Sequence, residues 1–397
     1  MIKYSQIKNK LKISSDKKQI SENAYITHFL QNRNEVNGIY KKNAVEYISK
    51  RIECNGKTEE LMVDEIEWDI PFPPLKNPDF KFIDLFAGIG GFRIALQELG
   101  GKCVFSSEID NAVKQTYEMN FGEFPFGDIR DFTGPEITDE QLIKLIPDHD
   151  VLAAGFPCQP FSLAGVSARV SLGQEHGFLD LVKGTLFFEI ARIVKLKRPT
   201  IVFLENVKNF KGHDKGNTFI TVKKTMEDLG YSFFSDILNA EKVVPQSRQR
   251  FYMVCFNREV TDFEFPIFEG EPKKLKDYLE KDVPEEYTIS DKLWEGHINR
   301  TKRNLERGTG FTANVTDLEK PAKTLVARYG KDGKECLIPQ EGKNPRKLTK
   351  RECARLQGFP ENFRLPVSKA AAYHQFGNSV SVPVIKAIAE KFIKYLD

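Results

Sequence analysis

The chain has 397 residues, of which 40% are hydrophobic and 29% charged, and its formal net charge is +3. This length exceeds one ordinary domain, and the sequence has no apolar run of about 18 residues, which excludes a membrane span. Lysines and no apolar signal region follow Met1, which predicts a cytoplasmic protein.

Six cysteines are scattered without a CxxC pair, so we expect reduced thiols and neither a metal site nor a disulfide framework. Charge is segregated along the chain. Residues 1–57 hold 12 Lys/Arg and 5 Asp/Glu, whereas residues 58–75 hold six acids and no base. Residues 320–355 hold 11 Lys/Arg and 4 Asp/Glu. A basic patch of this kind suits a polyanion such as nucleic acid, with a solvated surface as the alternative.

The first 75 residues form a basic amino-terminal extension, with short amphipathic helices expected at 20–29 and 44–52. Three prolines at positions 71, 73 and 74 close it. The extension has no convincing helix-turn-helix pattern. A DNA-binding or autoregulatory role and a packing arm therefore both stay open.

From residue 80, strands and helices alternate, which is typical of a doubly wound, mostly parallel sheet with helices on both faces. We expect strands at 81–86, 102–106, 150–153 and 201–204, a β-rich stretch through 251–256, and helices at 91–99, 111–120, 184–195 and 218–229. Beyond residue 257, turns and short strands such as 323–327 indicate a smaller β-rich domain, followed by helices at 350–357 and 384–396. The predicted parts are thus 1–75, 76–257, 258–366 and 367–397.

The first strand of the sheet runs into Gly88, Gly90 and Gly91 and then into a helix, which brings backbone N–H groups close to a ligand. The spacing differs from GxGxxG, which weakens a phosphate-binding interpretation. Glu108 ends the next strand and can accept both hydroxyls of a ribose, while Asp128 can accept from an adenine amino group. An adenosine site without a pyrophosphate cradle indicates S-adenosylmethionine. A tight turn and surface carboxylates are the alternative.

Cys158 lies in the run Gly-Phe-Pro-Cys-Gln-Pro-Phe-Ser, directly after the apolar residues 151–154. This run forces a sharp exit at the carboxyl edge of the sheet, where α/β proteins place reactive groups. Cys158 is therefore a candidate nucleophile. A buried structural cysteine is the alternative.

Glu205 follows the strand at 201–204, and a carboxyl group near a thiol is a candidate acid or base. Arg248 and Arg250 alternate in an extended segment, so both guanidinium groups would point to one face. That face suits a phosphate or a planar heteroaromatic ring. An exposed charged strand is the alternative.

In this order, the motifs resemble those of the bacterial DNA cytosine methyltransferases that modify carbon 5. The resemblance covers about residues 80–397 and rests on six motifs: Phe-Ala-Gly-Ile-Gly-Gly at 86–91, Pro-Cys-Gln at 157–159, Glu-Asn-Val at 205–207, Gln-Ser-Arg-Gln-Arg at 246–250, and the segments 351–360 and 375–380. It implies a Rossmann-like methyltransferase domain that uses S-adenosylmethionine, joined to a small target-recognition domain.

The resemblance also implies residue roles. Cys158 would add to carbon 6 of a flipped cytosine, and Glu205 would bind the N3 and amino edge. Arg250, grouped with Arg248 in the catalytic set, would hold the base. The cofactor would be surrounded by Phe86, Gly88, Ile89, Gly91, Glu108, Ile109, Asp128, Ile129, Pro157, Leu186, Asn378 and Ser379. Ile109 stands where the family often has an aromatic residue, which predicts weaker adenine stacking.

The implied partner is double-stranded DNA, with Gln159, Ser162, Arg328, Tyr329 and Lys331 as candidate contacts. Residues 162–177, 308–312 and 324–333 resemble the Dcm-like subgroup that methylates CCWGG or CCNGG sites. The resemblance further implies a monomeric bacterial enzyme and a cognate restriction endonuclease acting on the same site without direct contact. A tRNA cytosine-5 methyltransferase, an NAD-dependent oxidoreductase and a non-enzymatic DNA-binding regulator are the alternatives.

Overall fold

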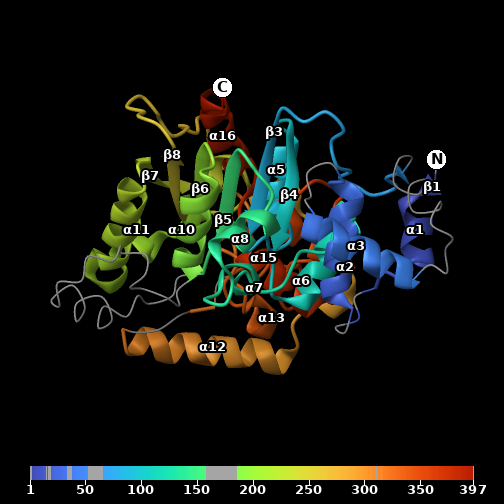
Figure 1. Cartoon of the computed structure of the whole chain (residues 1–397). Helices are drawn as coiled ribbons and strands as arrows, with labels where there is room; N and C mark the ends of the chain where they lie inside the picture. The colour runs from blue at the N-terminus through green and yellow to red at the C-terminus, as the bar shows by residue number, and fades with distance from the viewer. Residues whose placement is uncertain are drawn as a thin grey trace. The chain divides into compact units, whose positions relative to one another are not determined.

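A computed structural model describes residues 2–14, 16, 19–33, 38–51, 66–157, 186–308, 312–313 and 315–396, without the side chains of residues 38–40 and 332. The chain divides into two compact units. The first consists of Met1–Leu238, Arg250–Phe265 and Ile388–Asp397, and the second of Asn239–Gln249 and Pro266–Ala387. Figure 1 labels most of their helices and strands. Within the described ranges, no helix combines the length and apolar composition that crossing a membrane requires.

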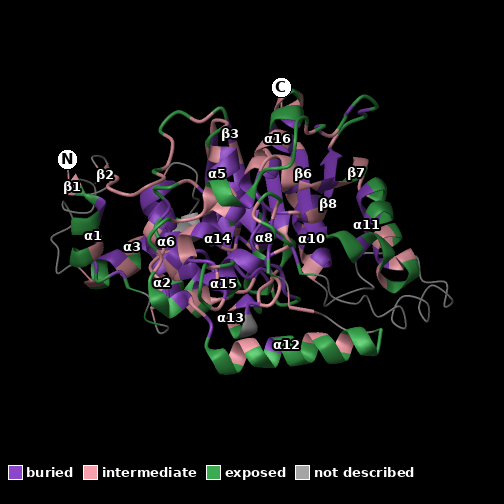
Figure 2. Cartoon of the chain, turned by 180° about the vertical axis from the view of Figure 1, so that it is seen from behind, coloured by how far each residue is buried: buried purple, intermediate pink, exposed green. Residues whose placement is uncertain are grey.

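The first unit contains a six-stranded sheet with the order β4-β3-β5-β6-β8-β7. Its strands are β3 (Phe80–Leu85), β4 (Gly101–Ser107), β5 (Val151–Gly155), β6 (Ile201–Val207), β7 (Ser232–Asn239) and β8 (Gln249–Phe256). β3 is parallel to β4 and β5, and β5 to β6, whereas β8 is antiparallel to β6. The predicted doubly wound, mostly parallel sheet is therefore confirmed. Its strands are largely buried (Figure 2), as expected for a sheet that is covered on both faces.

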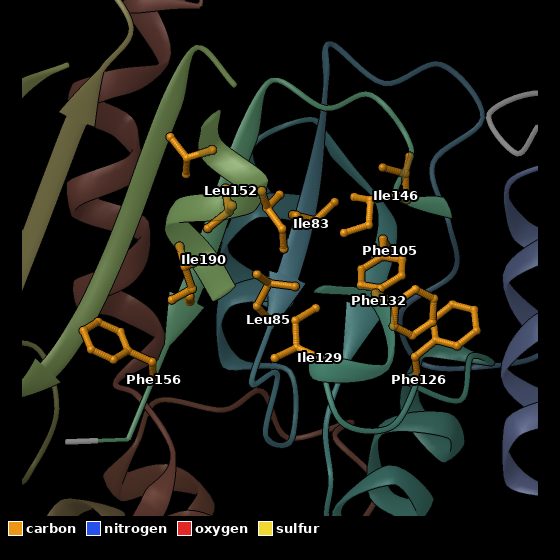
Figure 3. Packing of buried hydrophobic residues seen from close by; sticks show 14 of the residues in the cluster. Ile83, Leu85, Phe105, Phe126, Ile129, Phe132, Ile146, Leu152, Phe156 and Ile190 are labelled. Atoms are coloured by element: carbon orange, nitrogen blue, oxygen red, sulfur yellow. The ribbon is translucent and has the colours of Figure 1, made fainter. Parts of the chain in front are cut away.

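Successive strand residues point to opposite sides of this sheet, and both sides carry buried apolar side chains, so helices cover both faces. Ile83 and Leu152 share one buried cluster with Ile190 of α10 (Leu186–Lys197), as Figure 3 shows. On the other face, the Phe203 ring contacts Phe92 and Phe392, with centroids 5.2 and 5.3 Å apart. These two rings belong to α5 (Gly91–Gln97) and α16 (Val382–Phe392).

Beyond the amino-terminal extension, the first unit also contains α6 (Asn111–Phe121), α7 (Arg130–Thr133), α8 (Asp139–Leu145) and α11 (Asn217–Asp228), with the 3₁₀ turns η2 (Lys208–Gly216) and η6 (Ile393–Tyr395). Local signals set the ends of α6. The Asp110 carboxylate caps α6 by accepting the N–H of Ala112 at 2.8 Å, and Gly122 ends this helix at φ +66°. The four helices expected between residues 91 and 229 end within two residues of their predicted bounds.

The amino-terminal extension packs against the core of the first unit. It contains β1 (Ile2–Lys3), α1 (Tyr4–Lys10), α2 (Ile20–Gln31), α3 (Gly38–Arg51) and β2 (Ile66–Glu67), and β1 pairs with β2 in parallel. Ile7 of α1 and Ile26 of α2 are wholly buried in the cluster that contains the sheet residues. Of the two alternatives that the sequence left open, this burial supports the packing arm.

The regular secondary structure that is described in the second unit is mainly helical. It holds α12 (Asp291–Glu306), α13 (Tyr329–Asp332), α14 (Lys350–Leu356), α15 (Lys369–Asn378), the first turns of α16, and the 3₁₀ turns η3 (Ala240–Lys242), η4 (Leu275–Tyr278) and η5 (Glu285–Tyr287). Apart from the adjoining ends of β7 and β8, the β-structure described there consists of isolated bridges, such as that between Gln246 and Ala322. The predicted four-part organisation stays a prediction beside this two-unit division.

The predicted strand at 323–327 is wrong, because side chains take up its backbone groups. The Leu325 N–H donates to the Gln246 side chain at 2.7 Å, and the Leu325 carbonyl accepts from Arg248 at 3.0 Å. Gly377 of α15 also packs directly on the backbone of Val326 and Ala327, where any Cβ would overlap it. Close helix contact on this segment takes the place of strand pairing.

We expect His149 to make stability pH-dependent. Burial lowers the pKa of His149 to about 4, and its Nδ1 contacts the Pro147 carbonyl at 2.8 Å. The unfolded chain binds this proton near pH 6.5, so stability falls as the pH drops from 6.5 towards 4, by ~3 kcal/mol from this group alone. Urea unfolding midpoints across this range measure the effect. His149→Asn should show a shallower loss, and equal slopes for both proteins would contradict the prediction.

Candidate active site

The glycine turn between β3 and α5 borders open space at one position and is tightly packed at another. Phe86, Gly88 and Gly90 all have positive φ angles, of +55°, +54° and +84°. A Cβ at Gly90 would overlap the Phe121 ring, whereas no heavy atom lies within 4 Å of the corresponding position at Gly88. Gly90 is therefore required by packing. The space at Gly88 fits the predicted close approach of a ligand.

Glu108 is held against this turn from the end of the neighbouring strand β4. Its two carboxylate oxygens accept the N–H groups of Gly88 at 3.0 Å and Asp110 at 2.9 Å. Burial raises the pKa of Glu108 above its ordinary value, although these two N–H donors act in the opposite direction. The next residue, Ile109, is 68% exposed and offers an apolar surface beside the carboxylate.

The other predicted cofactor residues of the first unit differ in accessibility. The Asp128 carboxylate pairs with Arg130, whose Nε lies 3.0 Å from both oxygens, and these hydrogen bonds lower the pKa of Asp128. Ile89 and Ile129 are almost wholly buried in the core. Phe86 and Leu186 are half-buried, and Pro157 is exposed. Gly91 is buried. Their contact with a cofactor stays a prediction.

The carboxyl ends of β5 and β6 bring Glu205 beside the segment that leads to Cys158. Glu205 is in register with Gly155 on β5. Its Oε1 lies 3.2 Å from Nε of Arg250, and both side chains are nearly buried, at 11% and 14% exposure. The Asn206 amide donates to the Phe156 carbonyl at 2.9 Å, which ties the end of β6 to the chain two residues before Cys158. This edge therefore holds the Glu205 carboxylate beside the segment that leads to Cys158, with the Arg250 guanidinium next to it.

Three of the predicted residues, Cys158, Gln159 and Ser162, lie outside the described residues. The described cysteines are Cys103, Cys255, Cys336 and Cys353. All four are buried, and burial raises the pKa of each thiol, for Cys336 to about 12. A thiol of this kind forms little thiolate and is a poor nucleophile. None of these four therefore competes with Cys158 as the candidate.

Arg248 has a structural role in the second unit, which corrects the prediction that it belongs to the catalytic set. It is 2% exposed, and its guanidinium donates to the carbonyls of Leu325, Gly377 and Ser379 at 3.0, 3.0 and 2.6 Å. Donors that are directed at backbone carbonyls hold loops together. The alternation of Arg248 with Arg250 predicted a shared face, but Arg250 instead pairs with Glu205 in the first unit.

Tyr329 is also misassigned as a DNA contact. It is wholly buried; its hydroxyl donates to the Cys336 carbonyl at 2.6 Å and accepts the N–H of Leu348 at 2.9 Å. Its neighbours Arg328 and Lys331 are exposed and stay candidates. The predicted cofactor residues Asn378 and Ser379 lie at the end of α15 in the second unit, where Asn378 is exposed and Ser379 is buried.

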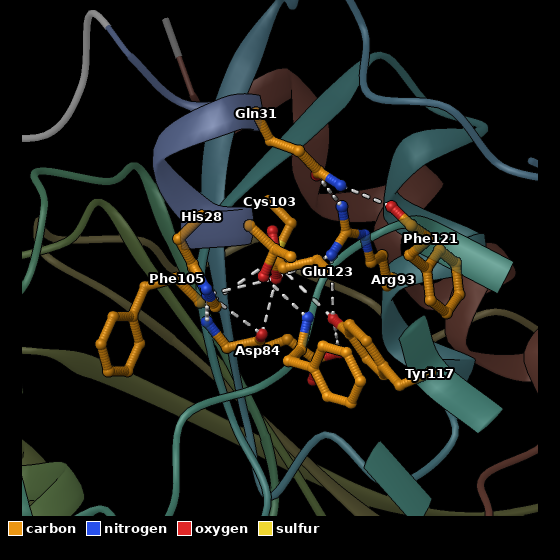
Figure 4. Close-up of polar contacts among 12 residues, drawn as sticks. His28, Gln31, Asp84, Arg93, Cys103, Phe105, Tyr117, Phe121 and Glu123 are labelled. Carbon is orange, nitrogen blue, oxygen red and sulfur yellow. Dashed lines mark hydrogen bonds and ion pairs between the residues drawn. The ribbon is translucent and has the colours of Figure 1, made fainter. Parts of the chain in front are cut away.

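The sequence analysis missed a buried polar network next to the glycine turn, shown in Figure 4. Arg93 of α5 is wholly buried and donates to Glu123 at 2.9 Å and to the Tyr117 hydroxyl at 3.3 Å. Burial raises the pKa of the adjacent Asp84 well above its usual value. An arginine within the otherwise apolar start of α5 was the available signal, since a buried charge needs a partner. Among the described residues, no cluster of three His, Cys, Asp or Glu suits a metal ion.

Comparison with known proteins identifies close relatives. A family model described as "C-5 cytosine-specific DNA methylase" matches residues 80–394. The chain is 48% identical over 328 residues to the Type II methyltransferase M.DsaV of Dactylococcopsis salina, covering 81% of this chain and 88% of the relative. It is 49% identical over 334 residues to the Type II methyltransferase M1.ScrFI of Lactococcus lactis subsp. cremoris, covering 82% and 81%. The structure of S. pombe Dnmt2 methyltransferase matches with a TM-score of 0.61 and 19% identity, covering 80% and 99%, which shows a shared fold.

Proposed function

The chain belongs to the C-5 cytosine-specific DNA methylase family and is a DNA (cytosine-5-)-methyltransferase, and from this premise we propose how its residues act. We propose that it methylates carbon 5 of one cytosine within a short, specific double-stranded sequence, with S-adenosylmethionine as donor. The observation that carries the proposal is the register of Glu205 with Gly155, which lies three residues before Cys158. Glu205 also pairs with Arg250.

The residues at the ends of β3 and β4 fit S-adenosylmethionine, which would supply an activated methyl group. Glu108 presents a fixed carboxylate to ribose hydroxyls, and the space at Gly88 allows the ligand to approach the backbone. Exposed Ile109 supplies an apolar contact for adenine. A carboxylate has about four lone-pair sites, so Asp128 can pair with Arg130 and still accept from the adenine amino group.

The proposed chemistry starts from the low nucleophilicity of cytosine carbon 5. The base is first swung out of the duplex, at a cost of a few kcal/mol. The Cys158 thiolate then forms a bond to carbon 6, while Glu205 holds a proton at N3 and Arg250 holds the base, so that the ring becomes an enamine. Bound S-adenosylmethionine would supply the methyl group to carbon 5 and leave as S-adenosylhomocysteine. Solvent then takes the carbon 5 proton, the C–S bond breaks, and the N3 proton returns to Glu205, which restores the aromatic ring and the thiolate.

We further propose that the enzyme protects the host's DNA in a restriction–modification system, because the two relatives are named Type II methyltransferases. A CCWGG-like or CCNGG-like target follows from the resemblance of the sequence at 162–177, 308–312 and 324–333. The proposal includes a monomeric cytoplasmic enzyme and a separate cognate endonuclease that acts on the same site.

The decisive test is transfer of labelled methyl groups from S-adenosylmethionine to plasmid DNA, followed by bisulfite sequencing. Methylation at one short palindrome would support the proposal and identify the target. Labelling of tRNA without labelling of DNA would replace the proposed substrate. Binding of DNA without any transfer would support a non-enzymatic regulator instead.

Glu108→Gln is expected to weaken S-adenosylmethionine binding about 10- to 100-fold, because an amide cannot accept both ribose hydroxyls as a carboxylate can. Calorimetric titration of the purified variant measures the dissociation constant. Glu98→Gln, which changes an exposed carboxylate just after α5, is the matched control and should bind like the wild type. Equal affinities for all three proteins would contradict the assigned role of Glu108.

A further inference from the structure

The edge strand β4 is completed by a side chain from the amino-terminal extension. β4 is the first strand in the sheet order, so its outer edge has no strand partner among the named elements of the described chain. The Ser106 N–H on β4 donates to Nε2 of His28 at 3.2 Å. The Ser106 carbonyl accepts the Phe126 N–H at 2.9 Å, and the Phe126 carbonyl accepts the Glu108 N–H at 3.0 Å. His28 and Phe126 are thus both hydrogen-bonded to the short stretch of backbone from Ser106 to Glu108.

His28 is suited to this role only in its neutral form. Because a backbone N–H can only donate, Nε2 must accept, and Nδ1 then carries the hydrogen and donates to the Ala24 carbonyl at 2.8 Å. The side chain is wholly buried, and this burial lowers the pKa of His28. Protonation at Nε2 would convert the acceptor into a donor, direct it to the Glu123 carboxylate, whose Oε1 lies 3.2 Å away, and remove the bond to Ser106.

Other residues of α2 hold the segment that follows α6. The Phe126 ring lies 4.4 Å from the His28 ring and 5.0 Å from the Tyr25 ring. The Phe124 N–H donates to the Thr27 hydroxyl oxygen at 3.0 Å. This segment is therefore clamped between α2 and β4, and it leads within two residues of Phe126 to Asp128.

A second connection runs from α2 to the helix after the glycine turn. The Gln31 side chain donates to the Phe121 carbonyl and accepts from Nη2 of Arg93, the latter at 2.7 Å (Figure 4). Arg93 lies on α5, which begins at Gly91. Residues of α2 thus contact three segments beside predicted cofactor residues of the first unit: the end of β4, the segment before Asp128 and, through the Arg93 side chain, α5.

We propose that α2 sets the affinity for S-adenosylmethionine, with His28 as a positioning residue for Glu108 and Asp128. The inference rests on the proposed function, because it assumes that these two carboxylates bind the cofactor. It goes beyond the family, whose model matches only from residue 80 onward. His28 acts through the backbone, because its Nε2 is the acceptor for the Ser106 N–H, two residues before Glu108. Without that acceptor, the buried N–H has lost its partner, and the end of β4 shifts to find another.

The test compares dissociation constants for S-adenosylmethionine in full-length variants. His28→Leu removes the acceptor and should raise the dissociation constant about tenfold, with kcat at saturating cofactor nearly unchanged. His28→Gln places an amide oxygen near the position of Nε2 and should restore most of the affinity. Thr27→Val keeps the side-chain volume, removes the Phe124 bond and should raise the dissociation constant about threefold, so it serves if His28→Leu does not fold.

Tyr4→Phe is the control for a merely structural contribution of the extension. It removes the hydroxyl contact of Tyr4 with Glu118, at 3.1 Å, without touching β4 or Phe126. Wild-type affinity in Tyr4→Phe together with weakened binding in His28→Leu or Thr27→Val supports the proposal. Equal affinities in all folded variants, or equal weakening in Tyr4→Phe, overturns it. If the wild-type protein itself binds no S-adenosylmethionine, the proposed function fails and this inference fails with it.

Discussion

Cys158→Ala is expected to reduce methyl transfer at least about 1,000-fold while leaving DNA affinity close to that of the wild type. Without the thiolate, carbon 6 gains no covalent partner and carbon 5 stays too weak a nucleophile to take the methyl group. Labelled transfer to plasmid DNA measures the first effect, and filter binding to the same DNA measures the second.

A trapping experiment separates loss of the nucleophile from loss of folding. With 5-fluorocytosine at the target position, fluorine cannot leave as the proton does, so the wild-type adduct should persist on a denaturing gel. Cys158→Ala should give no adduct. Cys353→Ala, which changes a buried cysteine of α14, is the matched control and should retain both activity and adduct. An adduct formed by Cys158→Ala would show that another residue attacks the base.

Glu205→Gln is expected to lower the single-turnover rate about 100- to 10,000-fold, the range typical of a positioned acid or base. The amide keeps the size of the side chain and can still contact Arg250, but it cannot hold a transferable proton at N3. Glu205 is nearly buried beside Arg250, so few waters screen its proposed contact with N3, and this contact is strong. Rapid-quench measurement at saturating cofactor and DNA gives the rate.

The control for this variant is Glu227→Gln, which alters an exposed carboxylate of α11 that lies 3.6 Å from Lys223. A surface ion pair of this kind contributes little, so the rate should stay within about twofold of the wild type. If Glu205→Gln kept a wild-type rate, the carboxyl group would have no role in proton transfer, and the stabilising role would pass to Arg250.

The sheet and the polar groups at its carboxyl edge were predictable because their signals are local. Residues 151–154 and 201–204 are continuous apolar runs, and Glu205 follows the second of them directly. Glu108 follows the last residue of β4. Parallel strands bring their carboxyl ends to one edge, so the order of motifs along the chain also predicted which groups would be neighbours. The register of Glu205 with Gly155 agrees with that reasoning.

The errors came from partners that are distant in sequence. Arg248 and Tyr329 have the residue types of a nucleic-acid contact, but Arg248 donates to the Gly377 carbonyl 129 positions away, and the Tyr329 hydroxyl accepts the Leu348 N–H 19 positions away. Burial of this kind leaves no local pattern. The contact of His28 with Ser106, 78 positions apart, was invisible for the same reason.

The order of chain segments in the first unit has a consequence for protein synthesis. Its last segment, Ile388–Asp397, is the final part of this sequence to be translated, yet Phe392 packs on Phe203 of β6 and Tyr395 packs on Phe256 of β8. Until that segment leaves the ribosome, these two strands keep apolar surface exposed to solvent and to other nascent chains. The first unit therefore cannot complete its core before residues 388–397 have been translated, and chains that stop short of Ile388 should be targets for chaperones and proteases.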